Sequence, residues 1–289
     1  AVTPPPAGPV RGASEYEDMQ GILLAWEGFT STIAQMAAAI TTTGNADVFI
    51  ACDSNSEANT ARNSCISAGA DPDRVITVVR STNTVWIRDY GPRYVFEGDC
   101  RVIIDHTYNR PRPNDNAYNS YFGSQFGHAV YEIPLTHGGG NYHLNGVGRS
   151  AATQLILNEN PGLSESQVVD YWRQYQNVET YLHDAFPTSV DYTQHIDMWM
   201  LMCGDERIII SDWPTQSGTI QDQICDAAVV YYENLGWEVF RTPAFAQGGT
   251  HYTYTNMVVC NDVILLPEYN DISNTYDNQA IAAVEAAMP

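Results

Sequence analysis

Short apolar runs alternate along the chain with stretches in which apolar residues recur at the spacing of one helix face. The runs are typical of buried strands, and the recurring spacing is typical of amphipathic helices. Strands are expected at residues 22–26, 47–52, 75–79, 129–133, 208–210, 237–240 and 263–267, and helices at 31–41, 56–68, 165–175, 221–235 and 278–287. Thr30 or Ser31 is the expected N-cap of the first helix. The alternation predicts an α/β protein.

Polar motifs containing Gly, Asp, His or Asn recur beside the expected strands, at residues 86–93, 138–142, 195–199 and 248–256. Their anchors Asp89, Asn141, His195 and Asn256 follow one another at intervals of roughly 50–60 residues, a period that indicates repeated units. Strand units repeated around an axis place one motif per unit at the centre. Alternatively, each motif marks only a turn, although the regular set favours repeats. A further anchor is due about 50–60 residues after Asn256 by the same period.

Composition narrows the classes of partner. The 289 residues carry a net charge of −21, and all thirteen basic residues are Arg. An acidic field repels nucleic acid and attracts cationic substrates. No apolar run approaches the ~20 residues of a membrane span, so no membrane partner is expected. Residues 1–19 begin with a Pro-rich segment and are expected to form an extended arm.

The chain begins with Ala1 and contains six cysteines. A removed signal peptide and a secreted, extracellular location are expected, with an artificially shortened N-terminus as the alternative. The even cysteine count is compatible with disulfides, for which Cys52 and Cys65 are the best candidate pair, or with buried free thiols. The cysteine spacing fits no zinc site.

Two motifs carry acid and base chemistry. Asp89 is flanked by Trp86 and Tyr90, an arrangement that suits a planar guanidinium; alternatively, Asp89 forms an ion pair with Arg88 or Arg93. His195 and Asp197 are expected to share one face of a strand, because strand residues two apart point the same way. They form a candidate proton-transfer and substrate-binding pair, or else a satisfied His–Asp pair in the core.

Two further segments are candidate substrate contacts. Arg110 and Arg112 are expected to point the same way on an extended segment stiffened by prolines and to bind a carboxylate; a solvated loop is the alternative. Gly138, Gly139 and Gly140 let the backbone at Asn141 approach the axis closely. This glycine run lacks the Lys and Ser/Thr of a phosphate loop.

In order along the chain, the motifs at 86–92, 139–142, 195–197 and 254–256, with the strand that runs to Pro267, resemble the Porphyromonas-type peptidylarginine deiminase and agmatine deiminase family. The resemblance implies a pentein fold, a five-bladed α/β propeller with pseudo-fivefold repeats whose last unit is incomplete here. Residues 20–289 would form the catalytic domain.

The resemblance also implies an activity, the hydrolysis of a guanidino group to a ureido group and ammonia. It assigns Asp89 and Asp197 to the guanidinium nitrogens, His195 to proton transfer and Asn256 to ordering the site, and Arg110 and Arg112 resemble the family's carboxylate clamp. Trp86 and Asn141 are further candidate substrate contacts of this chain. The paired arginines favour peptides with C-terminal arginine. The alternatives are an agmatine or small-guanidine branch and an inactive guanidinium-binding homologue. No cofactor is expected, although a structural calcium ion is compatible with the family.

The family's nucleophilic cysteine has no counterpart among the six cysteines of this sequence. Cys260 falls inside the strand-like apolar run Met257-Val258-Val259-Cys260, and His251-Tyr252 precedes the Tyr254-Thr255-Asn256 motif instead of following it. A tyrosine cannot replace the thiolate in this chemistry. A complementary C-terminal fragment carrying the cysteine, separated by proteolytic processing, is therefore the expected partner, together with an arginine-containing peptide or a small guanidino substrate.

Overall fold

The computed structural model describes residues 2–269 and 274–289, which divide into two compact units. Unit 1 contains residues 2–9, Glu15–Gly139 and Val259–Leu265, and unit 2 contains the remaining described residues. Within the expected arm of residues 1–19, β1 (Val10–Gly12) belongs to unit 2, and Thr3 Oγ1 accepts from the Glu132 amide at 2.7 Å in unit 1. No helix of the described residues is long and apolar enough to cross a membrane.

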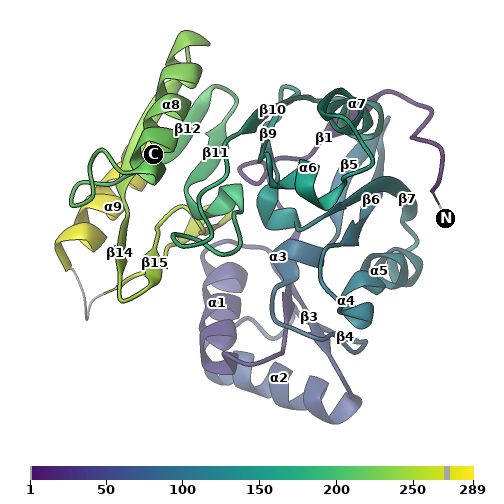
Figure 1. Cartoon of the computed structure of the whole chain (residues 1–289). Helices are drawn as coiled ribbons and strands as arrows, with labels where there is room; N and C mark the ends of the chain where they lie inside the picture. Colours follow the sequence, from purple (N-terminus) through teal and green to yellow (C-terminus); the bar gives the residue numbers. More distant parts are fainter. Residues whose placement is uncertain (1, 270–273) are drawn as a thin grey trace. The chain divides into compact units, whose positions relative to one another are not determined.

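Unit 1 begins with a parallel three-stranded sheet and two helices. The strands are β2 (Gly21–Ala25), β3 (Asp47–Cys52) and β4 (Val75–Val79), and the connecting helices are α1 (Thr30–Thr42) and α2 (Asn55–Ser67). The two helices pack against each other and on β3 (Figure 1). Burial of the apolar faces of these elements forms one core, which stabilises the layer because apolar area leaves water.

The start of α1 corrects the expected cap. Gly28 and Phe29 both adopt positive φ, at 86° and 48°, and Phe29 takes the N-cap position without a side-chain hydrogen bond. The chain thus enters the helix through a left-handed turn, which places Thr30 and Ser31 already inside it. By contrast, Ser164 caps α7 (Glu165–Gln176) in a reciprocal capping box with Gln167.

Three consecutive segments share one topology: an antiparallel strand pair, a helix and a third strand parallel to the second. They are β5 (Arg93–Glu97), β6 (Cys100–Tyr108), α5 (Tyr118–Phe126) and β7 (Ala129–His137); β8 (His143–Leu144), β9 (Arg149–Thr153), α7 and β10 (Glu179–His183); and β11 (Met200–Gly204), β12 (Arg207–Asp212), α8 (Ile220–Asn234) and β13 (Glu238–Pro243). This ββαβ repeat is the physical basis of the sequence period.

The remaining elements complete the two units. They are α4 (Pro113–Asn116), α6 (Leu155–Glu159), the hairpin of β14 (Phe245–Gln247) and β15 (Thr250–Tyr252), the pair β16 (Val258–Cys260) and β17 (Val263–Leu265), and α9 (Asn274–Ala287). In unit 2, α8 and α9 pack on the sheet of β12 and β13, and a core that includes Trp199, Trp213 and Tyr232 lies within that unit.

All six cysteines are free thiols, so the candidate pair Cys52 and Cys65 is not bridged. Both side chains are buried in the core of unit 1, Cys52 at the end of β3 and Cys65 on α2. Burial raises the pKa of Cys52 to about 12 and that of Cys65 to about 11. The alternative of buried free thiols therefore holds for five of the six cysteines, and Cys100 is an exposed thiol.

Candidate active site

Each polar motif lies directly before a strand of the ββαβ repeats or before β16. The short helix α3 (Ile87–Tyr90) precedes β5, and the single turns η1 (Gly139–Asn141) and η2 (Ile196–Met198) precede β8 and β11. Residues 253–256 precede β16. The spacing of the motifs is thus the spacing of the strand units.

In unit 1, Asp89 lies in a short helical turn. Residues 87–90 are helical, and the Asp89 amide donates to the Trp86 carbonyl at 3.0 Å. The Trp86 side chain is 54% exposed, and Asp89 is half-buried. Gly91 is required at the end of the turn, since a Cβ there would lie 2.4 Å from the Ile87 carbonyl oxygen. The turn therefore presents an exposed ring three residues before a partly accessible carboxylate.

Two buried histidines pack beside this turn, and one of them bonds its backbone. His106 Nε2–H donates to the Asp89 backbone carbonyl at 2.9 Å, and its ring stacks on that of His137 at 4.0 Å. Burial lowers the pKa of His106 to about 4, so the ring is neutral at neutral pH. Arg88, one of the alternative ion-pair partners for Asp89, pairs with Glu15 at 2.7 Å.

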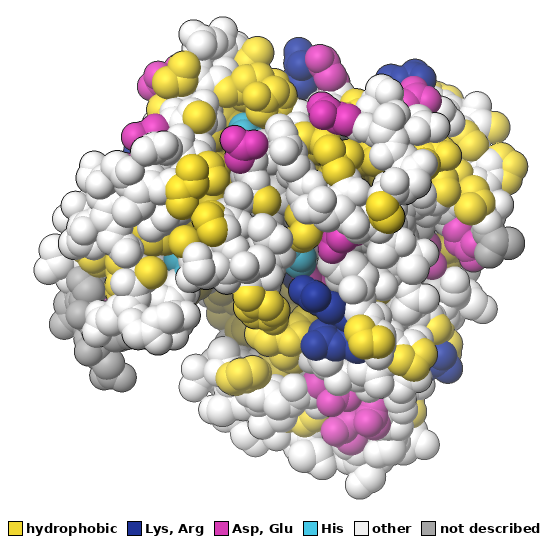
Figure 2. Space-filling view, in the orientation of Figure 1, with side chains coloured by type: hydrophobic (Ala, Val, Ile, Leu, Met, Phe, Trp, Pro, Cys, Tyr) yellow, Lys and Arg dark blue, Asp and Glu magenta, His cyan; other side chains and the backbone are white. Residues whose placement is uncertain are grey.

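Arg110 and Arg112 lie in a turn, which corrects the expected extended segment. The Arg112 amide donates to the Arg110 carbonyl at 2.8 Å immediately before α4. Arg112 Nη1 donates to the Tyr108 hydroxyl at 2.9 Å and to Thr84 Oγ1 at 3.4 Å. Burial and the charge of Asp89 raise the pKa of Tyr108 to about 12, while Arg112 opposes the shift. On the visible face, basic side chains gather near α4, next to hydrophobic ones (Figure 2).

In unit 2, the Asn141 side chain ties two motifs together. Its Oδ1 accepts from the Thr153 amide at 3.0 Å, the Thr153 hydroxyl at 2.9 Å and the Ile196 amide at 3.2 Å. Asn141 is buried, with 1% of its surface exposed. These bonds give Asn141 a positioning contact with the turn that carries His195 and Asp197.

His195 and Asp197 do not lie in a strand, which corrects that expectation. His195 takes the N-cap position of η2 without a side-chain cap bond, and the Trp199 amide donates to the Ile196 carbonyl at 3.1 Å, the bond of a tight helical turn. Because Asn141 takes the Ile196 amide, the ladder of β11 begins only at Met200. Both side chains are buried.

The motif at 253–256 joins the same cluster of unit 2. Thr255 Oγ1 donates to the Asp197 backbone carbonyl at 2.9 Å, and Asn256 Nδ2 contacts the Met198 sulfur at 3.6 Å. The Asn256 side chain is exposed, in contrast to Asn141. Direct contacts thus bring Asn141, the turn of His195 and Asp197, and Asn256 together, while Trp86, Asp89, Arg110 and Arg112 are positioned by unit 1.

Several supporting residues were not predicted from the sequence. Buried Asp115 accepts the amides of Asn83 at 2.5 Å and Thr84 at 3.3 Å, and the Thr84 hydroxyl at 2.9 Å. Buried Asp191 pairs with His251. Neither Asp115 nor Asp191 belongs to a polar motif. His251 does lie in the motif at 248–256, just after Gly248 and Gly249, which both have positive φ.

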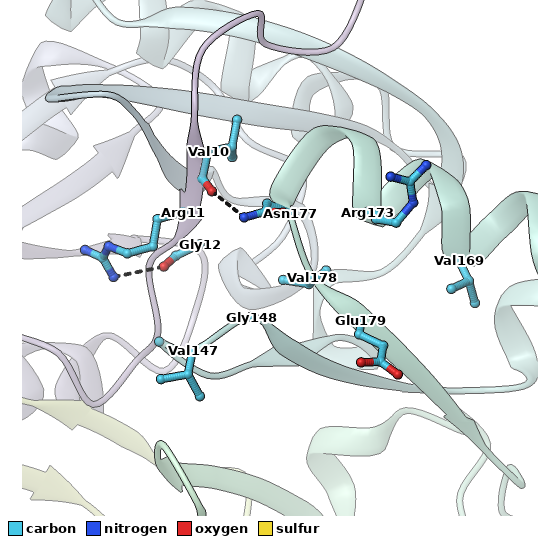
Figure 3. A pocket seen from close by; sticks show the side chains of 11 residues that line it. Val10, Arg11, Gly12, Val147, Gly148, Val169, Arg173, Asn177, Val178 and Glu179 are labelled. Atoms are coloured by element: carbon cyan, nitrogen blue, oxygen red, sulfur yellow. Dashed lines mark hydrogen bonds between the residues drawn. The ribbon is translucent and has the colours of Figure 1, made fainter.

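A separate cavity of about 600 Å³ lies in unit 2. It is lined by Val10, Arg11, Gly12, Gly146, Val147, Gly148, Val169, Arg173, Asn177, Val178 and Glu179. The Val10 carbonyl accepts from Asn177 Nδ2 at 3.0 Å, and Arg11 and Arg173 extend in different directions (Figure 3). The cavity contains none of the predicted site residues.

Residues 15–289 match the sequence profile of the Porphyromonas-type peptidyl-arginine deiminase family. The chain belongs to this family. A Shewanella baltica protein provisionally named agmatine deiminase is 33% identical over 142 residues, which are 44% of this chain and 38% of that protein. The matched stretch therefore spans well under half the length of this relative.

Solved structures of similar fold superpose on nearly the whole length of this chain. The agmatine deiminase of C. jejuni superposes with a TM-score of 0.78, covering 97% of this chain and 88% of that one at 17% identity. A provisionally named arginine deiminase of Porphyromonas gingivalis gives a TM-score of 0.81 over 96% of this chain and 90% of that one, also at 17% identity. These likenesses establish the α/β deiminase fold.

Proposed function

We propose that this chain supplies the guanidinium-binding and proton-transferring groups of a deiminase, which hydrolyses a guanidino group to a ureido group and ammonia. One observation carries the proposal: His195 and Asp197 lie on one buried turn that Asn141 and Thr255 hold by hydrogen bonds. Hydrogen bonds that fix the backbone of a turn suit a side chain that must exchange protons with a bound substrate.

In the proposed reaction, a cysteine thiolate attacks the guanidinium carbon, and His195 gives a proton to the departing nitrogen, which leaves as ammonia. Water then attacks the same carbon, giving one proton to His195 and its second proton to the released ammonia or to solvent, and the carbon–sulfur bond breaks to release the ureido product and the thiolate. Asp197 holds guanidinium N–H groups by charge-assisted hydrogen bonds. Asp89 is the second carboxylate that the family resemblance assigns to this task. This chemistry requires no cofactor.

The attacking thiolate is proposed to come from a cysteine outside these 289 residues. Burial raises the pKa of Cys52 to about 12 and that of Cys203 to about 12, and it also raises the pKa values of Cys65, Cys225 and Cys260. A thiol with a raised pKa is a poor nucleophile at neutral pH. Cys100 is exposed at the start of β6, directly after the β5–β6 turn, and belongs to none of the polar motifs.

The preferred substrate class is a peptide that ends in arginine. The support is Arg112, whose guanidinium is held by Tyr108 and Thr84 and whose neighbour Arg110 is partly exposed. Two arginines on one turn suit a carboxylate. Agmatine is the second candidate, because the named relatives are agmatine deiminases. The repeated ββαβ unit supports the further proposal of a five-bladed arrangement.

A substrate panel tests this function in the natural full-length protein. Ammonia release is measured with a peptide that ends in free arginine, the same peptide amidated, and agmatine. Preference for the free carboxylate supports the peptidyl-arginine branch, and preference for agmatine supports the second candidate. Ammonia release from none of the three would contradict the proposed activity.

A further inference from the structure

A buried acid–base pair lies next to the turn that carries His195 but belongs to none of the family motifs. His251 Nδ1 and Asp191 Oδ2 are 3.1 Å apart, and each side chain is 3% exposed. Because a carboxylate oxygen accepts, the bond places a proton on Nδ1 of His251. Both residues lie in unit 2.

The other oxygen of Asp191 fixes the segment that leads into His195. Oδ1 accepts from the Thr193 amide at 2.8 Å and from the Gln194 amide at 3.3 Å, and it also accepts from the Thr193 hydroxyl. Thr193 Oγ1 in turn accepts from the His195 amide at 3.3 Å. The Asp191 carboxylate therefore connects His251 to Thr193, and Thr193 connects it to the backbone of His195.

The same segment holds an unfavourable conformation that needs support. Gln194, directly before His195, has a φ of 58°, in the left-handed region that non-glycine residues seldom adopt. Its Nε2 donates to the Phe186 carbonyl at 2.7 Å, and its carbonyl oxygen lies 2.9 Å from the Thr153 hydroxyl, whose single proton it shares with Asn141 Oδ1. Strained backbone of this kind persists where surrounding contacts determine it, and such positions cluster at functional sites.

His251 itself is held by rings and retains one polar atom without a partner. Its ring stacks on Trp213 at 5.0 Å and lies 5.8 Å from Phe186. Among the described residues, Nε2 of His251 is buried and has no hydrogen-bond partner. A buried pair of this kind is weak evidence for stability, because apolar side chains of similar volume often serve as well. The pair is therefore better explained by what its hydrogen bonds position.

We propose that His251 is a positioning residue that, through Asp191, fixes the 191–195 segment and so sets the orientation of the His195 imidazole. The inference rests on the proposed function of His195. If the bond between His251 and Asp191 only held the β14–β15 hairpin in place, its loss would leave the proton affinity of His195 unchanged. The proposed role predicts that the proton affinity changes.

Two substitutions separate the donor of His251 from its ring. His251→Phe keeps the stacking on Trp213 and removes the donor to Asp191, whereas His251→Asn keeps an N–H near the position of Nδ1 and removes most of the ring. His128→Phe is the matched control, since His128 bonds Tyr94 in unit 1 and makes no bond to the 191–195 segment. Asp191→Asn is the independent second variant.

The first measurement is the titration of His195 by NMR of the histidine-labelled natural full-length protein, which does not depend on turnover. His251→Phe and Asp191→Asn should shift the His195 midpoint by about half a pH unit or more, a change of the size that a rearranged hydrogen-bond partner produces. His251→Asn should restore most of the original midpoint, and His128→Phe should not change it.

The second measurement is ammonia release from a peptide that ends in arginine. His251→Phe should lower kcat roughly tenfold, as expected for a misaligned proton-transfer group, with less than about a twofold change in KM. An unshifted His195 midpoint in both His251→Phe and Asp191→Asn would overturn the proposal, as would failure of His251→Asn to restore it. An inactive wild-type protein whose His195 midpoint still shifts would contradict the proposed function and leave the positioning role supported.

Discussion

Asn83 and Asp115 bind each other's backbone in unit 1. The Asn83 amide donates to Asp115 Oδ1 at 2.5 Å, and the Asp115 amide donates to Asn83 Oδ1 at 3.4 Å. Asn83 lies three residues before Trp86, and Asp115 lies three residues after Arg112. This reciprocal pair therefore holds the segment before the Asp89 turn against the turn that carries the two arginines.

Removing this acid should destabilise the fold. Asp115→Ala leaves two amides and one hydroxyl without their acceptor in a fully buried position, and we expect a loss of about 3 kcal/mol in the free energy of unfolding. Asp115→Asn keeps an oxygen for the amides and should lose less than half as much. Urea denaturation measures both, and equal stability of Asp115→Ala and wild type would contradict the assigned contacts.

The sequence pattern could not reveal this pair. Asp115 follows Pro113 in a polar stretch that looks like a solvated loop, and its burial arises only when residues 83–84 fold onto it. The Trp86–Pro92 motif was identified, yet the elements that hold it in place are separated from it in sequence. Motifs locate chemistry along a chain, whereas tertiary hydrogen bonds decide which residues support it.

A tight backbone contact explains one glycine of the 138–140 run. A Cβ on Gly139 would lie 2.3 Å from the Arg88 carbonyl oxygen, so Gly139→Ala must displace the turn that carries Asp89. We expect a loss of about 2 kcal/mol, typical of a forced overlap in packed structure. Gly162→Ala is the control, because nothing lies within 4 Å of its added Cβ and its φ is not left-handed. The comparison requires only the urea midpoints of the two variants, and equal midpoints would refute the contact.

Asp105 should make stability fall as pH rises. Burial, with a contribution from the charge of Glu132, raises its pKa to about 6 against the bond from Asn119. The folded protein then binds more protons than the unfolded chain between about pH 4 and pH 6, so stability is lost as pH rises through this range. The shift corresponds to at most about 3 kcal/mol.

Asp105→Asn removes this titration and keeps an oxygen for Asn119, which donates to Asp105 Oδ1 at 2.8 Å. The variant should therefore gain stability relative to wild type at pH 8 and lose this advantage at pH 4. Parallel stability curves for the two proteins over this range would contradict the raised pKa.

The hydrogen bond that holds the Arg112 side chain should favour substrates with a free carboxylate. Tyr108→Phe removes the hydroxyl that accepts from Arg112 at 2.9 Å. Losing a bond worth about 1 kcal/mol should raise KM for peptides with free C-terminal arginine about fivefold. KM for agmatine should not change, because agmatine has no carboxylate. Tyr94→Phe, which loses a bond to His128 instead, is the control; a similar rise for both substrates in Tyr108→Phe would exclude the carboxylate role.

The regular elements were predicted well where the pattern was purely local. The strands at 47–52 and 75–79 are confirmed to the residue, and the α/β class is confirmed. The prediction for His195 and Asp197 was wrong in its geometry because the side chain of Asn141, distant in sequence, takes the Ile196 amide away from a strand ladder. The extended prediction for Arg110 and Arg112 failed because two prolines permit a turn as readily as an extended segment.

Product formation by the natural full-length protein tests the proposed role of the His195 and Asp197 turn in converting a guanidino group to a ureido group. Ammonia and the ureido product are measured with wild type, Asp197→Asn, His195→Gln and the control Asp205→Asn, whose side chain is exposed at the β11–β12 turn. Wild type and Asp205→Asn should each form ammonia and the ureido product in equal amounts. Asp197→Asn and His195→Gln should form both products about a hundredfold more slowly or worse, the scale of removing an acid–base group. Undiminished product formation by Asp197→Asn and His195→Gln would contradict the proposed role of this turn.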